Sequence, residues 1–422
     1  MKNLRITTSQ MDWFKILESQ SKQVLFVGGL VRDELLGKQS KDVDLLVLGM
    51  DLIDIEQILL PFGTVVSQNV GGKVASLKFQ PFDWTEDEPI DIVIPRTERK
   101  TGEGHTGFEI IVDKDLPLEE DMKRRDFTIN AICMDGKGNL FDVFGGVEDL
   151  KNKKLRMVSQ NTFVEDPLRM LRAVQFASRF EFEIEEATFL QIQGNAHLIK
   201  QITPERILIE FKKIVEKGKP ELGLSLLQDT TLFNHIFETK LKTDLDLSEA
   251  QKIKTIGEFV FVILKDIYVK EPFGFKVVDK GLISFAKDKL KLDNHGLKEI
   301  EALQAAQEHL FELNCENTTY LKRLTVCQIN KICSSVLEQS LLISKQLKNC
   351  FFDDFQSGKF PISLKQLAVN GDDLLTLDFQ PKKIGFVLNE LLFAVLDEKV
   401  ENNKQQLVQR AERFLSFCKN NV

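Results

Sequence analysis

Hydrophobic and polar positions follow two different patterns along the chain. Up to about residue 150, short apolar runs alternate with glycines and charged residues, whereas from about residue 152 apolar residues recur at helical spacing. The short runs predict strands within 24–29, 42–49, 74–79, 89–96, 127–135 and 140–146. Segments 33–37 and 52–63 between them have helical patterns. We therefore expect an α/β N-terminal head followed by an all-helical body.

Within the body, the spacing predicts helices over 165–180, 185–199 and 203–218. Thr203 and Pro204 suit the N-cap and first position of the last helix. The changes of pattern divide the chain into a head of residues 1–151, a first helical part of residues 152–220 and a second helical part of residues 221–422.

The composition is that of a soluble globular protein, with 422 residues, 43% apolar and 28% charged. No signal-peptide pattern opens the chain, no apolar run is long enough to span a bilayer, and the six cysteines form no CxxC pair. These features indicate a cytoplasmic protein without a membrane partner. The net charge of -8 argues mildly against nucleic acid, although it says nothing about a local basic groove.

Two aspartates interrupt an otherwise apolar strand pattern. Asp42 and Asp44 are two residues apart, so their carboxylates point to one face of the strand. Such neighbours repel each other unless a cation lies between them. Metal ions on this pair could activate a hydroxyl and hold a triphosphate, with Asp91 on a later strand as a third acid. The alternative is a solvated strand end.

A glycine pair ends the first strand, and a helix pattern follows at once. Gly28 and Gly29 allow a ligand to approach the backbone, and Arg32 in the first helical turn suits a phosphate contact. A tight strand-to-helix turn without a ligand would have the same pattern.

The segment KRRDFTINA, residues 123–131, concentrates charge before an apolar run. Arg125 could contact phosphate or base, and Asp126 a ribose hydroxyl. A charged loop entering a strand is the simpler interpretation.

In VEDPLRMLRA, residues 164–173, Asp166, Arg169 and Arg172 are spaced three apart and would share one helix face. An acceptor beside a donor suits the edge of a base, whereas an intrahelical salt bridge would need no ligand. The polar segment 96–108 has no periodicity and indicates a mobile loop.

Taken together, the motifs resemble the class II tRNA nucleotidyltransferase and bacterial poly(A) polymerase family of the polymerase-β superfamily. The matching pieces, within residues 24–215, are GGLVRD, DVD, RRDFTIN, LFDVFGGVEDL, EDPLRMLRA and TPERI.

The resemblance implies a polymerase-β-like nucleotidyltransferase head and a set of site residues. Asp42 and Asp44 would bind Mg²⁺, with Asp91 as the third acid. Nucleotide contacts would come from Gly29, Arg32 and Arg125, and a protein template for the base from Asp166, Arg169 and Arg172. Some members carry a further arginine where this chain has Gln175.

The implied reaction is template-independent addition of CCA to the 3′ end of tRNA from CTP and ATP, with release of pyrophosphate. The helical body would bind tRNA, and no DNA partner is expected. Alternatives within the family are an A-adding enzyme and a poly(A) polymerase. Outside it, a catalytically inactive RNA-binding protein and a small-molecule nucleotidyltransferase share parts of the pattern.

Overall fold

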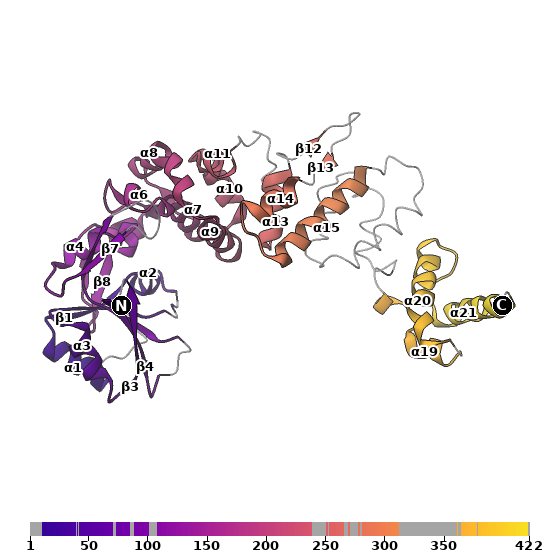
Figure 1. The fold of residues 1–422 in the computed structure, drawn as a ribbon, viewed down its shortest axis with the longest axis horizontal. Coiled ribbons are helices and arrows are strands. Elements are labelled where there is room, and N and C mark those ends of the chain that lie inside the picture. Colours follow the sequence, from indigo (N-terminus) through magenta and orange to yellow (C-terminus); the bar gives the residue numbers. More distant parts are fainter. Residues whose placement is uncertain are drawn as a thin grey trace. The chain divides into compact units, whose positions relative to one another are not determined.

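The computed structural model divides the chain into two compact units, Met1–Lys240 and Leu241–Val422 (Figure 1). The structure describes residues 11–38, 40, 42–70, 73–84, 88–100, 108–238, 250–251, 253–265, 269–270, 277–278, 281–311, 361, 364–377 and 379–420.

The head is built on a seven-stranded sheet of order β3-β4-β5-β2-β1-β8-β9. The strands are β1 (Gln23–Val27), β2 (Asp44–Leu48), β3 (Gly63–Val70), β4 (Lys73–Pro81), β5 (Ile90–Val93), β8 (Ile132–Asp135) and β9 (Leu140–Asp142). β2 and β5 run parallel and the other neighbours antiparallel. The parallel register places Asp44 opposite Asp91.

Helices cover both faces of this sheet because its central strand is apolar on both sides. The head helices are α1 (Asp12–Gln20), α2 (Gly29–Leu35), α3 (Leu52–Leu59), α4 (Leu118–Lys123), the 3-10 turn η2 (Thr128–Asn130) and α5 (Gly146–Lys151). On one face the ring of Phe14 in α1 stacks on Phe26, with centroids 5.6 Å apart. On the other face, Leu25 and Val27 pack against Met122 of α4. Burial of this kind stabilises a core by roughly 1.5–3 kcal/mol per large side chain.

The helical part that follows belongs to the same unit as the head. Its elements are β10 (Lys154–Leu155), α6 (Thr162–Glu165), α7 (Leu168–Phe180), β11 (Glu183–Ile184), α8 (Glu186–Asn195), η3 (Ala196–Gln201), α9 (Pro204–Lys217), α10 (Pro220–Asp229) and α11 (Leu232–Phe237). α7 packs on α9 and α10. Thr203 is the N-cap residue of α9 and Pro204 is at its start, as predicted.

The second unit is mainly helical in its described part. It contains α13 (Ile256–Lys265), β12 (Val269–Lys270), β13 (Val277–Val278), α14 (Gly281–Asp288), α15 (Asn294–Phe311), η6 (Leu364–Gln366), α19 (Gly371–Leu375), α20 (Pro381–Leu396) and α21 (Lys404–Asn420). α13 packs against α15, and α19, α20 and α21 share a separate apolar cluster. None of the helices in the described residues is long and apolar enough to cross a membrane.

The fold class is confirmed, with local corrections. The body is not entirely helical, because β10 pairs with β11 and β12 with β13. Residues 128–130 form a 3-10 turn instead of a strand. β3 was not predicted, since it is an edge strand whose polar side chains hide the alternation.

The predicted loop over 96–108 is in part a β-hairpin. β6 (Arg96–Lys100) pairs with β7 (Phe108–Val112), and the intervening residues 101–107 lie outside the described part of the chain.

Replacing Gly146 and Gly194 by alanine should change the free energy of unfolding in opposite directions. A Cβ at Gly146 would lie 2.1 Å from the carbonyl oxygen of Thr128, so Gly146→Ala forces α5 away from η2 and should cost about 1–3 kcal/mol. A Cβ at Gly194 in α8 meets nothing within 4 Å, so Gly194→Ala should add roughly 0.5–1 kcal/mol. Thermal unfolding of both variants tests this packing. Equal melting temperatures would contradict the close approach at Gly146.

Candidate active site

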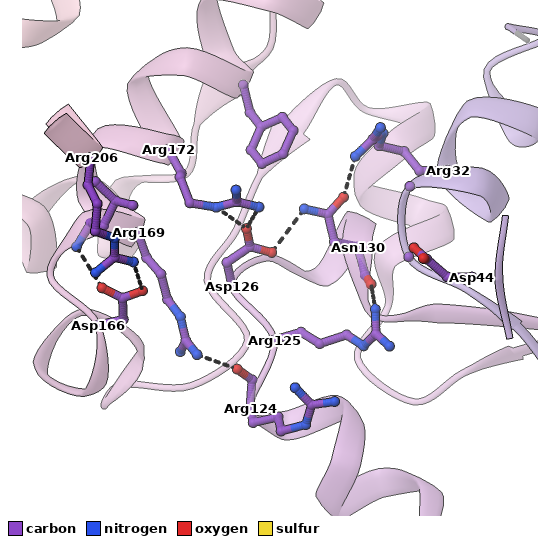
Figure 2. A pocket seen from close by; sticks show the side chains of 14 residues that line it. Arg32, Asp44, Arg124, Arg125, Asp126, Asn130, Asp166, Arg169, Arg172 and Arg206 are labelled. Atoms are coloured by element: carbon purple, nitrogen blue, oxygen red, sulfur yellow. Dashed lines mark hydrogen bonds and ion pairs between the residues drawn. The ribbon is translucent and has the colours of Figure 1, made fainter. Parts of the chain in front are cut away.

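A cavity of about 430 Å³ lies between the sheet end of the head and α7 (Figure 2). Its lining residues come from α2, β2, the segment around η2, α7 and α9: Gly28, Gly29, Arg32, Asp44, Arg124, Arg125, Asp126, Asn130, Asp166, Leu168, Arg169, Arg172, Phe176 and Arg206. Six of these are arginines and three are aspartates. This excess of positive charge suits a polyanion such as a nucleoside triphosphate.

The glycine turn brings the chain to the edge of the cavity. Gly28 has φ 69°, a conformation that favours glycine, and it precedes the first residue of α2. A Cβ here would lie 3.0 Å from Nη1 of Arg125 and 3.8 Å from Oδ2 of Asp44. Gly28 therefore lies between the Arg125 guanidinium and the Asp44 carboxylate, and a larger residue would fill the space between these two groups.

The three strand acids lie at one end of the sheet. Asp44 begins β2 and is paired in register with Asp91 of β5, while exposed Asp42 lies just before the strand instead of within it. Burial and the neighbouring Asp91 carboxylate raise the pKa of Asp44 to about 6. Lys78 of β4 lies 3.3 Å from Asp91 and is its ion-pair partner.

The carboxylate oxygens of these acids are the type of ligand that a hard divalent cation prefers. Crowded carboxylates with a raised pKa gain stability from a cation, and Mg²⁺ is commonly held by one or two carboxylates together with phosphate oxygens of the substrate. In the described residues, no group of three or more His, Cys, Asp or Glu side chains is arranged around a single point for a metal. Asp44 and Asp91 therefore fit a divalent cation by their donor type and by their crowding at one end of the sheet.

Asp126 is buried and fully engaged with protein groups. Its Oδ2 accepts bonds of 2.9 and 2.7 Å from Arg172, and its Oδ1 accepts from the Asn130 amide and the Phe127 backbone. Burial opposes ionisation, but Arg172 and the hydrogen bonds outweigh it and hold the pKa of Asp126 below its ordinary value. A contact with ribose would have to share these oxygens.

Asp166, Arg169 and Arg172 do not share one helix face as predicted, because only the two arginines lie in α7. Asp166 is extended and precedes α7, because Pro167 occupies the N-cap and the helix begins at Leu168. The Asp166 carboxylate accepts from the Leu168 backbone and, at 3.1 Å, from Arg206 of α9. The intrahelical Asp–Arg pair considered for these residues is thus replaced by a bridge from α9.

Arg169 and Arg125 both line the cavity, and both donate to backbone carbonyl oxygens of residues 124–130. Arg169 donates to the carbonyl oxygen of Arg124 and to Thr162 and Glu165. Arg125 donates to the carbonyl oxygen of Asn130 at 3.3 Å.

Asp121, which is completely buried, contacts the consecutive arginines Arg124 and Arg125. Its Oδ1 accepts from Arg124 and from the backbone of Arg96, and its Oδ2 is 4.0 Å from Arg125. One carboxylate therefore holds both arginines and the start of β6.

The structure brings together all eight residues predicted for nucleotide binding, and Asp44 with them: Gly28, Gly29, Arg32, Arg125, Asp126, Asp166, Arg169 and Arg172. Asp42 and Asp91 lie outside the lining. Gln175 is buried in α7 and does not line the cavity.

Apart from the apolar Leu168, four lining residues had no role predicted from the sequence. Arg124 and Asn130 lie in the RRDFTIN motif, and Arg206 lies in TPERI. Phe176 is one residue beyond Gln175. The motifs contained the first three, but spacing alone could not show that they meet.

Two family models match the first unit. The Poly A polymerase head domain matches residues 24–156, and the "Probable RNA and SrmB- binding site of polymerase A" matches residues 181–240. Among solved structures, the Thermotoga maritima CCA-adding enzyme complexed with tRNA is similar, with a TM-score of 0.71, 20% identity, and coverage of 98% of this chain and 99% of that one. At this identity the likeness shows the fold.

Curated relatives extend the similarity to nearly the whole chain. The multifunctional CCA protein of Vibrio campbellii is 41% identical over 212 residues, and the matched part spans about half of each chain (49%). The CCA-adding enzyme of Ligilactobacillus salivarius is 32% identical over 409 residues, which cover 93% of both proteins. This chain therefore belongs to the family of CCA-adding tRNA nucleotidyltransferases.

Proposed function

We propose that the cavity between the head and α7 is where this chain carries out the reaction of its family. The chain adds C, C and A to the 3′ end of tRNA, using CTP and ATP and releasing pyrophosphate. The observation that supports this site is the meeting of six arginines with Asp44 in one cavity. The tRNA 3′-oxygen forms a bond to the α-phosphorus of the nucleotide, and the bond to pyrophosphate breaks.

The phosphate end of the nucleotide is assigned to Arg32 and Arg125, beside the glycine turn. Both guanidinium groups line the cavity next to Gly28, and each has donors beyond those used in its protein contacts. Their positive charge would neutralise the triphosphate and the departing pyrophosphate. The helix α2 begins at Gly29, so its backbone N–H groups also face this end.

Members of this family generally use a divalent metal, and Mg²⁺ held by Asp42 and Asp44 is our proposal for this chain. When bound, the ion would lower the pKa of the attacking hydroxyl and stabilise charge on the α-phosphate. Asp44 is held in place by its strand register, whereas Asp42 lies just before the strand. Asp91 serves as the third acid, and Lys78 is its present counter-ion.

The base end is assigned to the start of α7. Asp166 presents an acceptor and Arg169 a donor to the cavity, and both match the edge of cytosine or adenine, which carry an amino group beside a ring acceptor. Uracil and guanine place a carbonyl oxygen where that amino group would be. Arg206 fixes the Asp166 carboxylate, so acceptor geometry is set before the base arrives.

The three-part division also remains a proposal. Residues 1–151 would carry catalysis, 152–220 base recognition and 221–422 tRNA binding. We further propose a cytoplasmic location, where tRNA maturation requires CTP and ATP.

The direct test is incubation of the chain with tRNA lacking CCA, in the presence of CTP, ATP or both, followed by sequencing of the added ends. We expect CC with CTP alone and CCA with both nucleotides. A long A tail would indicate a poly(A) polymerase, and extension only of tRNA ending in CC would indicate an A-adding enzyme.

In the same assay, Asp42→Asn or Asp44→Asn should reduce addition roughly 1,000-fold, equivalent to about 4 kcal/mol, with tRNA binding retained. The exposed Asp54→Asn is the matched control.

Metal-free protein should show the cost of crowding at Asp44. Its folded pKa is about 6 against an ordinary 3.8, so the folded state holds a proton between these pH values that the unfolded chain has released. Stability should therefore fall as pH rises from about 4 to 6, and Asp44→Asn should remove that loss, on the order of 1–3 kcal/mol at pH 7. Urea unfolding in chelator measures it. Parallel pH curves for wild type and Asp44→Asn would contradict the crowding.

Base selection should depend on the Asp166 acceptor. Asp166→Ala should lower use of CTP and ATP and relax discrimination against UTP and GTP by roughly tenfold, since one mismatched buried polar pair costs about 1–3 kcal/mol. The control is Glu205→Ala, an exposed acid nearby that does not line the cavity. Competition among the four nucleotides on one tRNA provides the ratio. Unchanged selectivity in Asp166→Ala would place base reading elsewhere.

A further inference from the structure

A closed ring of contacts joins the two ends of the cavity. Nη1 of Arg32 donates to Oδ1 of Asn130 at 2.6 Å, and Nδ2 of Asn130 donates to Oδ1 of Asp126 at 2.9 Å. Asp126 accepts in turn from Arg172. Figure 2 shows this line of bonds running from Arg172 to Arg32. Arg32 and Arg172 both lie over the ring of Phe176, which closes the circuit.

Asn130 is chemically matched to its place in the ring. Arginine only donates and an ionised carboxylate only accepts, so the residue between them must accept on one side and donate on the other. An amide does both, and this fixes its orientation. Asn130 is 7% exposed, and its backbone oxygen also accepts from Arg125. A single residue thus contacts Arg32, Asp126 and Arg125.

Phe176 packs against both arginines at the ends of the hydrogen-bonded line. The Cζ atoms of Arg32 and Arg172 lie 5.4 and 5.2 Å from its centroid, within the range of cation–π attraction. Phe180 stacks on Phe176 and lies 4.9 Å from Arg32. These rings restrict two long side chains, each of which would otherwise sample several rotamers.

We propose that Asn130 and Phe176 are positioning residues that couple Arg32 to Arg172, so that the phosphate end and the base end of the nucleotide are recognised together. This inference rests on the proposed function, in which Arg32 serves the triphosphate, and on the template role that the family resemblance implies for Arg172, which lies in α7 with Arg169 and lines the same cavity. A change in either coupling residue should then disturb both ends. A residue that served one end alone, or only the core, would not.

Two measurements separate the ends. Binding of inorganic tripolyphosphate, followed by calorimetry, reports the phosphate end without a base, and the ratio of kcat/KM for CTP over UTP reports the base end. Asn130→Leu, which removes donor and acceptor at similar volume, should weaken tripolyphosphate binding and lower the CTP/UTP ratio, each about tenfold. Phe176→Leu should reduce both roughly threefold, whereas Phe176→Tyr, which keeps the aromatic face, should stay within about twofold of wild type.

The control is Phe233→Leu, a fully buried ring near Phe237 that does not line the cavity. Phe233→Leu should lower the melting temperature without changing tripolyphosphate binding or the CTP/UTP ratio. The coupling would be overturned if Asn130→Leu changed only tripolyphosphate binding or only the CTP/UTP ratio. It would also be overturned if Phe176→Leu and Phe176→Tyr reduced both quantities equally. If Asn130→Leu does not fold, the two Phe176 variants decide the question. Wild-type protein that adds no CTP to tRNA would instead refute the proposed function, and tripolyphosphate binding would still be measurable.

Discussion

Six arginines around one cavity repel each other, and much of the surrounding structure offsets that repulsion. Four of the six guanidinium groups lie beside a buried carboxylate. Asp126 holds Arg172, Asp121 holds Arg124 with Arg125 nearby, and Asp33 holds Arg32. These carboxylates are almost completely buried, so water screens their attraction to the arginines only weakly. The result is a set of guanidinium groups fixed in position before a nucleotide is bound.

The same requirement explains why the head and the first helical part form one unit. Arg32 and Asp33 belong to α2, but their aromatic and charged neighbours Phe176, Phe180 and Arg179 belong to α7. The nucleotide cavity is therefore built by contacts that also hold α7 against the head. The proposed base-reading residues at the start of α7 therefore adjoin a helix that is held against the head by the neighbours of Arg32 and Asp33.

Much of the fold was readable because apolar periodicity determines which faces are buried. The strands β1, β2 and β5 and the helices α7 and α9 lie within a few residues of the predicted segments. β3 escaped notice as an edge strand, and the hairpin of β6 and β7 lacks an apolar alternation in its first strand. Pro167 is the reason that Asp166 is not helical, and the spacing of three residues concealed it.

The site was readable as residue types but not as pairs. Spacing placed Asp166 and Arg169 on one helix face, whereas the carboxylate is held by Arg206, 40 residues away. The bond from Asn130 to Arg32 spans 98 residues, and no local pattern indicates it. Long-range pairing of this kind is set by the tertiary fold, so the sequence predicted roles for Asp166 and Arg32 but not for their partners Arg206 and Asn130.

On the proposed assignment, one nucleotide spans the cavity from the glycine turn to the start of α7. The most direct measurement is a crystal structure of this chain with CTP and a divalent metal. We expect phosphate oxygens within hydrogen-bonding distance of Arg32 and Arg125, and the cytosine edge against Asp166 and Arg169. Triphosphate bound away from Arg32, or a base that faces away from Asp166, would contradict it.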